Sequence, residues 1–471
     1  MPLKTTFALC LAAALPASAF AQTRQTLHAP VPRTTFEGLS LEFEFPGMLI
    51  GTAEYDEGPT GVTVFYFPNR VKGAVDVRGG APGTVNTDAL RLGYDDRQMS
   101  AVVLSGGSWQ GLSAVAGIAD VIRTSLTDSI HPPIIRGAVG AIVNDLGSGS
   151  ARRRFSMATP DHALAAAAFR TARPGKFLLG ARGGGRFAMT GGALGRREFS
   201  GQGGAFRQIG PTRIAVFTVV NAAGLVVDRT GKIMRCREMH WGEKCGTITE
   251  RLAKTIDTLA NRRVSTNPSD SPLMPSDNTT ISLVVTNQKL DWASLNRLAV
   301  QVHTSMARGI QPFATIGDGD VLYAVTTDEV DNPQLSIGQL GVIASELAWD
   351  AVLSSVPKGD PVISTTPVTI DSKTLDDFTG RYELGPGSRM TVTRRGNTIV
   401  AESATGGAYI AAGSPNDLTP IGKDHFLISG TRHDTIRFTR GANGRVTGLV
   451  INPGNWALPA HRVGTAPSQT Q

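Results

Sequence analysis

Apolar and polar residues alternate along several short stretches of the chain, and this pattern predicts β-strands. Elsewhere apolar residues recur three and four positions apart, which predicts helices over about 291–308 and 337–353. A strand, a Gly-Gly turn and a helix are expected in succession from residue 101 onward. The other expected strands are 61–68, 73–78, 212–221, its pairing partner 224–229, 281–285 and 320–327. This mixture predicts a layered α/β domain.

The pattern changes after residue 356. Residues 357–372 contain three prolines and no helical period, so they are expected to form a linker. From 373 to 465, apolar and polar residues alternate around Gly- and Asn-rich turns, which predicts a small all-β, barrel-like domain. The expected organisation is an N-terminal segment 1–21, an α/β domain 31–356, the linker 357–372 and the β domain 373–465.

The first 21 residues have the features of a secretory signal peptide. Lys4 is followed by a short apolar core, and Ala19-Phe20-Ala21 is a small-x-small cleavage site. A buried N-terminal helix is the alternative. With a signal peptide, the mature chain begins at Gln22 and is periplasmic or secreted, and no later stretch has the roughly 18 apolar residues of a membrane span.

Charge and cysteine content narrow the possible partners. The formal net charge is +7, but basic residues are scattered, and Arg152–Arg154 lacks the interleaved aromatic residues of a nucleic-acid surface, so no nucleic-acid partner is expected. Cys236 and Cys245 are expected to form a local disulfide in an oxidising compartment. His240 between them leaves a metal site as the alternative, although it offers only three ligands.

Two glycine-rich stretches resemble known motifs without completing them. Ser108 follows two glycines at a strand-to-helix turn, but a nucleophile elbow needs glycine where Gln110 stands, so a structural turn is expected. Residues 180–187 resemble a phosphate-binding loop and lack its closing Gly-Lys-Ser/Thr. No cofactor is expected.

The stretch "GDGD" places Asp318 and Asp320 two residues apart at the start of a strand, so both side chains can lie on one face. Two close carboxylates titrate together, and one tends to hold a proton. The flanking glycines allow close approach of a substrate or another backbone. An ordinary turn with solvated acids is the alternative.

The stretch "NTT" places Thr279 directly after Asn278, where a loop meets a strand. A hydroxyl needs a nearby base to become a nucleophile, and an N-terminal threonine has one in its own α-amino group. Self-cleavage between Asn278 and Thr279 would create that terminus. Taken alone, "NTT" is equally an unremarkable turn.

Six stretches between about Gly73 and Thr327 resemble the L-aminopeptidase/D-esterase (DmpA-like) family, which is related to ornithine acetyltransferases and includes nylon-oligomer endohydrolases. They are "GAVDVRGGAPGTVNTDAL", "VVLSGGSWQGLSAVAGIADVI", "HPPIIRGAV", "VVNAAG", "NTTISLVVTN" and "GDGDVLYAVTT". The resemblance implies a self-cleaving hydrolase with an αββα sandwich of the DmpA/ArgJ type. By motif, Thr279 matches the family's nucleophile and Asn221 its oxyanion-stabilising side chain. Asp318 and Asp320 match the residues that orient the nucleophile and relay protons.

Some positions depart from the family pattern. Asn144 stands where relatives have a tyrosine, and it is a candidate substrate contact; Met189 falls nearest to an expected lysine. Aminopeptidase members carry serine at the position of Asp318, so the aspartate pair resembles the nylon-oligomer branch.

We expect an aminopeptidase-like amide hydrolase acting on a peptide or small amide, as a homo-oligomer of processed two-chain units. The alternatives are an endo-acting hydrolase of short amide oligomers and an inactive binding or scaffold relative.

Overall fold

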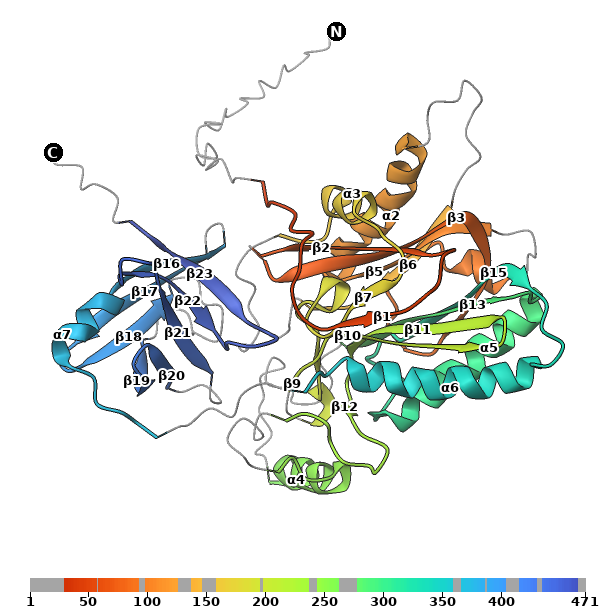
Figure 1. Ribbon diagram of the computed structural model, residues 1–471. Coiled ribbons are helices and arrows are strands. Elements are labelled where there is room, and N and C mark those ends of the chain that lie inside the picture. The colour runs from red at the N-terminus through yellow and green to blue at the C-terminus, as the bar shows by residue number, and fades with distance from the viewer. Residues whose placement is uncertain are drawn as a thin grey trace, which may run out of the picture.

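The computed structural model describes residues 29–464 except 57, 93–97, 126–136, 146–157, 195–197, 237–243, 262–277, 359–365, 386–387, 404–414 and 430–433. The expected signal peptide, Arg152–Arg154 and His240 lie outside the described residues. The chain forms a large α/β region that contains the N-terminal part of the described chain and a barrel that contains the C-terminal part (Figure 1).

The α/β region is built on one mixed sheet with the strand order β10-β11-β13-β15-β3-β5-β6-β4, and β2 pairs with β3. The long strand β3 divides this sheet into two halves and belongs to both. Its residues 72–77 pair with β15 of one half, and its residues 60–66 pair with β2 of the other. The strands are β2 (Leu49–Tyr55), β3 (Thr60–Val77), β4 (Thr84–Val85), β5 (Gln98–Ser105), β6 (Gly137–Ile142), β10 (Gln202–Ile209), β11 (Thr212–Asn221), β13 (Thr279–Gln288) and β15 (Val321–Val330).

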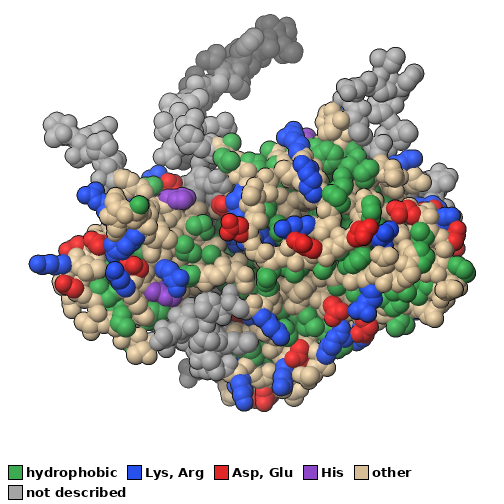
Figure 2. Space-filling view, in the orientation of Figure 1, with side chains coloured by type: hydrophobic (Ala, Val, Ile, Leu, Met, Phe, Trp, Pro, Cys, Tyr) green, Lys and Arg blue, Asp and Glu red, His purple; other side chains and the backbone are tan. Residues whose placement is uncertain are grey.

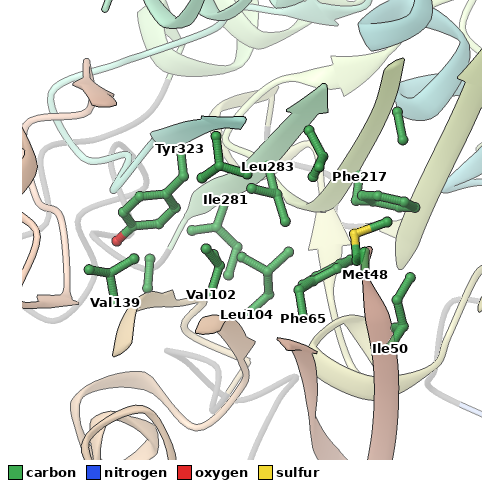
Figure 3. Packing of buried hydrophobic residues seen from close by; sticks show 14 of the residues in the cluster. Met48, Ile50, Phe65, Val102, Leu104, Val139, Phe217, Ile281, Leu283 and Tyr323 are labelled. Atoms are coloured by element: carbon green, nitrogen blue, oxygen red, sulfur yellow. The ribbon is translucent and has the colours of Figure 1, made fainter. Parts of the chain in front are cut away.

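The two halves of the sheet pack face to face around an apolar core. Phe217, Leu283 and Tyr323 from one half lie opposite Phe65 and Leu104 from the other (Figure 3). Burial of these apolar side chains is the main force that holds the two halves together, since each fully buried side chain of this kind contributes about 1.5–3 kcal/mol.

Helices cover both outer faces of the folded sheet. Helices α5 (Trp292–Ser305) and α6 (Ile337–Ser354) pack on the half that contains β10, β11 and β15. Helices α2 (Ser108–Ser125) and α3 (His162–Arg170) pack on the half that contains β2, β5 and β6. The layers are therefore helix, sheet, sheet and helix, and the predicted αββα sandwich is confirmed.

The predicted helices begin at capping residues. Asp291 accepts a hydrogen bond from the Ser294 backbone N–H and starts α5, and Ser336 forms a capping box with Gln339 and starts α6. In α5, Leu295, Leu298 and Val302 are buried, as their spacing predicts. Helix α4 (Ile248–Ala260) lies outside the sandwich (Figure 1).

The predicted division into two strands and one predicted pairing differ from the structure. The stretches 61–68 and 73–78 form strand as predicted, but they belong to the single strand β3, whose register with β5 shifts between Tyr66 and Val71, where Arg70 has φ +61°. The run 224–229 contains only the short β12 (Leu225–Val226), which pairs with β14 (Ile310–Gln311) rather than with β11.

The C-terminal part is a closed eight-stranded barrel, as expected for the appended all-β domain. Its interior is apolar and contains Phe378, Tyr382, Phe426 and Phe438. Its strands are β16 (Gly380–Gly385), β17 (Ser388–Arg395), β18 (Thr398–Ser403), β19 (Asn416–Gly422), β20 (His425–Ile428), β21 (Thr435–Arg440), β22 (Val446–Ile451) and β23 (Leu458–Val463).

Side chains of both charges are interspersed over the face shown in Figure 2, consistent with the scattered basic residues of the sequence. Among the described residues, the helices are too short or too polar for any of them to cross a membrane. A disulfide joins Cys236 to Cys245, with their Cα atoms 5.5 Å apart.

Candidate active site

Thr279 is the first residue of β13, a strand that is buried along its whole length. Its hydroxyl donates a hydrogen bond to the carbonyl oxygen of the preceding residue, Asn278, at 2.5 Å. Both residues are buried, with exposed fractions of 4% and 5%. The hydroxyl therefore lies against the peptide bond that it would have to attack in self-cleavage.

The same carbonyl oxygen has a second donor. The backbone N–H of Gly319 donates to Asn278 O at 2.9 Å. A Cβ atom on Gly319 would lie 2.7 Å from Thr279 Oγ1 and 2.7 Å from Ala81 O, so only glycine fits between them. This backbone N–H is placed to stabilise negative charge on the Asn278 oxygen.

Asn221 lies directly across from Thr279, because the last residue of β11 pairs with the first residue of β13. Its Oδ1 accepts a hydrogen bond from the Met189 backbone N–H at 2.9 Å, and its Nδ2 donates to Asn144 O at 3.1 Å. These two bonds fix which end of the carboxamide is the donor. Asn144 and Met189 therefore both contact Asn221, through backbone atoms.

Asp318 and Asp320 are fully buried and receive backbone hydrogen bonds. Asp318 accepts from Ala223 at 3.0 Å and from Thr315 at 2.8 Å. Asp320 accepts from Thr280, the residue after the candidate nucleophile, and from Ala314 at 3.1 Å. The pair is therefore part of the buried site, and the alternative of solvated turn acids is wrong.

Burial raises the pKa of Asp320 well above its usual range, and the neighbouring Asp318 carboxylate raises it further. The hydrogen bonds from Thr280 and Ala314 act in the opposite direction. A raised pKa means that Asp320 is able to hold a proton next to the start of β13. Perturbed carboxyl groups of this kind are concentrated at catalytic sites.

The structure thus brings Thr279, Asn278, Asn221, Asp318 and Asp320 together from β11, β13 and the loop before β15. Hydroxyl, amide donor and acid pair are the groups required for acyl transfer. Within the described residues, no group of three or more His, Cys, Asp or Glu side chains is arranged to hold a metal ion.

The other glycine-rich motifs have structural partners. The Gly183 N–H in the stretch 180–187 donates to the buried Glu54 carboxylate at 2.8 Å, so this backbone donor already has an acceptor within the protein. Ser108 begins α2 with φ +53°, and its backbone N–H donates to Val143 O. The sequence did not indicate the backbone donors of Ala223, Thr315 and Gly319, since every residue except proline carries such a group. Of the three, only Gly319 lies in a stretch, "GDGD", that the sequence pattern singled out.

Residues 44–366 match the model of peptidase family S58. A 6-aminohexanoate-oligomer endohydrolase of Paenarthrobacter ureafaciens is 39% identical over 338 residues, which cover 69% of this chain and 88% of the relative. An uncharacterised aminopeptidase of Mycobacterium bovis is 33% identical over 322 residues, 64% of this chain and 87% of the relative. The L-aminopeptidase D-Ala-esterase/amidase of Ochrobactrum anthropi is 16% identical, with a TM-score of 0.45 over 68% of this chain and 88% of that one.

Proposed function

This chain belongs to peptidase family S58 and is an amide hydrolase, and we propose that it is exported, cleaves its own Asn278–Thr279 bond and then uses Thr279 as an N-terminal nucleophile. The proposal of self-cleavage rests on one observation. The Thr279 hydroxyl and the Gly319 N–H both lie on the carbonyl oxygen of Asn278, at 2.5 and 2.9 Å.

Self-cleavage then proceeds by acyl transfer from nitrogen to oxygen. Thr279 Oγ attacks the carbonyl carbon of Asn278, the C–N bond breaks, and the released amine takes up the proton of the hydroxyl. Water hydrolyses the resulting ester, which leaves a carboxylate on Asn278 and restores the hydroxyl. The Gly319 N–H stabilises the oxyanion formed in both steps.

The new α-amino group of Thr279 is the base for turnover of substrate. Its pKa near 8 lets it accept the hydroxyl proton at neutral pH. The Thr279 oxygen attacks the substrate carbonyl, Asn221 Nδ2 donates to the developing oxyanion, and the protonated amine gives its proton to the leaving amine. Water then hydrolyses the acyl–Thr279 ester, which releases the acid and restores the hydroxyl. Asp318 and Asp320 orient the nucleophile and hold protons near its amine.

Processing is tested on purified protein expressed with its N-terminal segment. We expect a denaturing gel to show two chains, 22–278 and 279–471, because the strand-start geometry favours attack at that bond. N-terminal sequencing is expected to find Gln22 and Thr279 as the two first residues. A single full-length band would contradict self-cleavage and favour the inactive scaffold, whereas Met1 at the first terminus would contradict export alone.

The proposed activity is aminopeptidase-like hydrolysis of peptides or small amides. Internal cleavage of short amide oligomers is the second candidate, and two observations favour it. Asp318 supplies a carboxylate beside Asp320, and the relative named for 6-aminohexanoate oligomers is more similar than the one named as an aminopeptidase, at 39% against 33% identity.

Three substrates separate the two activities: an aminoacyl p-nitroanilide, its N-acetylated counterpart and an aminohexanoate oligomer. An aminopeptidase is expected to cleave only the compound with the free α-amine, since the buried acids then bind that ammonium group. An endohydrolase is expected to cleave the oligomer and to tolerate the acetyl group. Release of product is followed by absorbance or by mass spectrometry, with unprocessed Thr279→Ala protein as the blank.

A further inference from the structure

We infer that the C-terminal barrel completes the active site: Trp456 holds residues 186–194 and 198–200, here called the bridging segment, and through it the Asn221 carboxamide. The inference rests on the proposed oxyanion role of Asn221. It makes Trp456 a positioning residue, because it lies in the barrel between β22 and β23 and acts through other residues.

Trp456 is buried between the barrel and the α/β domain. Its indole Nε1–H donates to Ser200 O at 2.6 Å, and its ring stacks on Phe199 with centroids 5.9 Å apart and planes at 22°. The guanidinium carbon of Arg235 lies 3.7 Å from the ring centroid. Only 2% of Trp456 is exposed, so this barrel side chain is enclosed in large part by residues of the other domain.

The barrel and the bridging segment share one apolar core. Phe187, Met189 and Phe199 belong to the same buried cluster as the barrel interior. Next to it, Arg186 Nη2 donates to Ala457 O at 2.8 Å, while its Nε lies 3.4 Å from the buried Glu54 carboxylate. An apolar interface with a buried charge pair keeps the two domains in a fixed relation, unlike a flexible tether.

Hydrogen bonds continue from Trp456 to the site by two routes. Ser200, whose carbonyl accepts from Trp456, donates through Oγ to Val220 O at 2.5 Å, next to Asn221. The Ser200 N–H donates to Ala188 O at 3.0 Å, and the adjacent Met189 N–H donates to Asn221 Oδ1 at 2.9 Å. The first route ends at Val220, the residue before Asn221, and the second ends at the Asn221 side chain.

The bridging segment also contacts the rest of the site. A Cβ on Gly192 would lie 3.1 Å from Asn278 Oδ1, and the Ala193 N–H donates to Ala223 O at 3.0 Å. Ala223 in turn donates to the Asp318 carboxylate. A displaced bridging segment would therefore disturb the oxyanion donor most directly, and misplacement by 1 Å is able to cost about 10²-fold in rate.

Trp456→Ala in the full-length protein tests the inference. We expect kcat per processed chain to fall on the order of tenfold or more, with a much smaller change in KM, and Trp456→Phe, which keeps the stacked ring, to recover part of the loss. Amide hydrogen exchange is expected to become faster in peptides that contain Met189 and Val220. In the Asn221→Ala background, Trp456→Ala should lower kcat little further, because the donor it positions is already absent.

Trp349→Ala is the matched control. Trp349 also donates to a backbone carbonyl, Val227 O at 3.3 Å, and lies under an arginine, with Arg229 at 4.7 Å, but it is part of α6, and both of these partners lie outside the bridging segment. We expect it to lower stability without changing kcat or the exchange of those peptides.

Unchanged exchange of the Met189 and Val220 peptides in Trp456→Ala overturns the inference, as does an equal loss of kcat in the wild-type and Asn221→Ala backgrounds. Normal turnover of Asn221→Ala alone would instead contradict the proposed role of Asn221. The exchange measurement, which needs no activity, then still decides whether the barrel holds the bridging segment.

Discussion

Thr279→Ala is expected to give a single uncleaved chain without hydrolytic activity. The substitution removes the hydroxyl that lies 2.5 Å from the Asn278 carbonyl oxygen, so no ester forms and the peptide bond stays intact. Without cleavage the α-amino group of residue 279 remains an amide nitrogen, which cannot act as a base. One substitution thus removes both the nucleophile and its base. Intact-mass measurement and the p-nitroanilide assay follow the two losses separately.

Two further variants, one at position 279 and one at position 280, control for the loss of a buried threonine. Thr279→Ser keeps the hydroxyl, so we expect processing to continue. Thr280→Val removes the next hydroxyl along β13, which is also buried, but keeps the backbone N–H that donates to Asp320. Cleavage is expected to persist in this variant. If Thr279→Ala protein still splits after Asn278, another group performs the cleavage and Thr279 loses its assigned role.

Helices and long strands of the α/β domain were predictable because their signals are local. The apolar stripe of Leu295, Leu298 and Val302 and the cap at Asp291 together define α5. The strand ending at Asn221 also has its predicted bounds. In contrast, the fusion of two predicted strands into β3 depends on a register shift with β5, and the pairing of β12 with β14 depends on a partner about 85 residues away in sequence.

The candidate site was predictable in its side chains but less so in its contacts. Thr279, Asn221 and the aspartates occur in stretches whose residue types suit acyl transfer, and the fold brings these stretches to adjacent strands. The contacts of Asn221 with Met189 and Asn144 involve backbone atoms, which carry no residue-specific signal. The packing of Trp456 against Phe199 joins two domains, and alternation of residue types within either domain does not indicate it.

Under the proposed mechanism two oxyanions form, one in self-cleavage and one in substrate turnover. The Asn278 oxygen of the uncleaved chain accepts from the Gly319 N–H, which belongs to the loop of the acid pair. The carboxamide of Asn221 approaches from the opposite strand, β11. Because the two donors come from different elements, loss of one is expected to affect self-cleavage and substrate turnover to different extents.

Asn221→Ala is therefore expected to lower turnover strongly while the protein still folds. Loss of one oxyanion donor costs about 2.7–4 kcal/mol of transition-state stabilisation, or roughly 10²–10³-fold in kcat. Turnover is measured per processed chain, so slower self-cleavage does not enter the value. Asn221→Asp is expected to lower kcat by as much, because aspartate keeps an acceptor for the Met189 N–H but has no N–H to donate to the oxyanion.

Asn287 provides a matched control for this prediction. It is a fully buried asparagine near the other end of β13, where its Oδ1 accepts from the Arg213 N–H at 2.7 Å and its Nδ2 donates to Pro211 O at 3.1 Å. The two asparagines thus make the same kinds of bond about 25 Å apart along the strand direction. Asn287→Ala should lower the free energy of unfolding about as much as Asn221→Ala, by about 1–3 kcal/mol for the unpaired groups it leaves, with kcat unchanged. Equal kcat in the two alanine variants would remove Asn221 from the catalytic site, since stability alone would then explain its place in the fold.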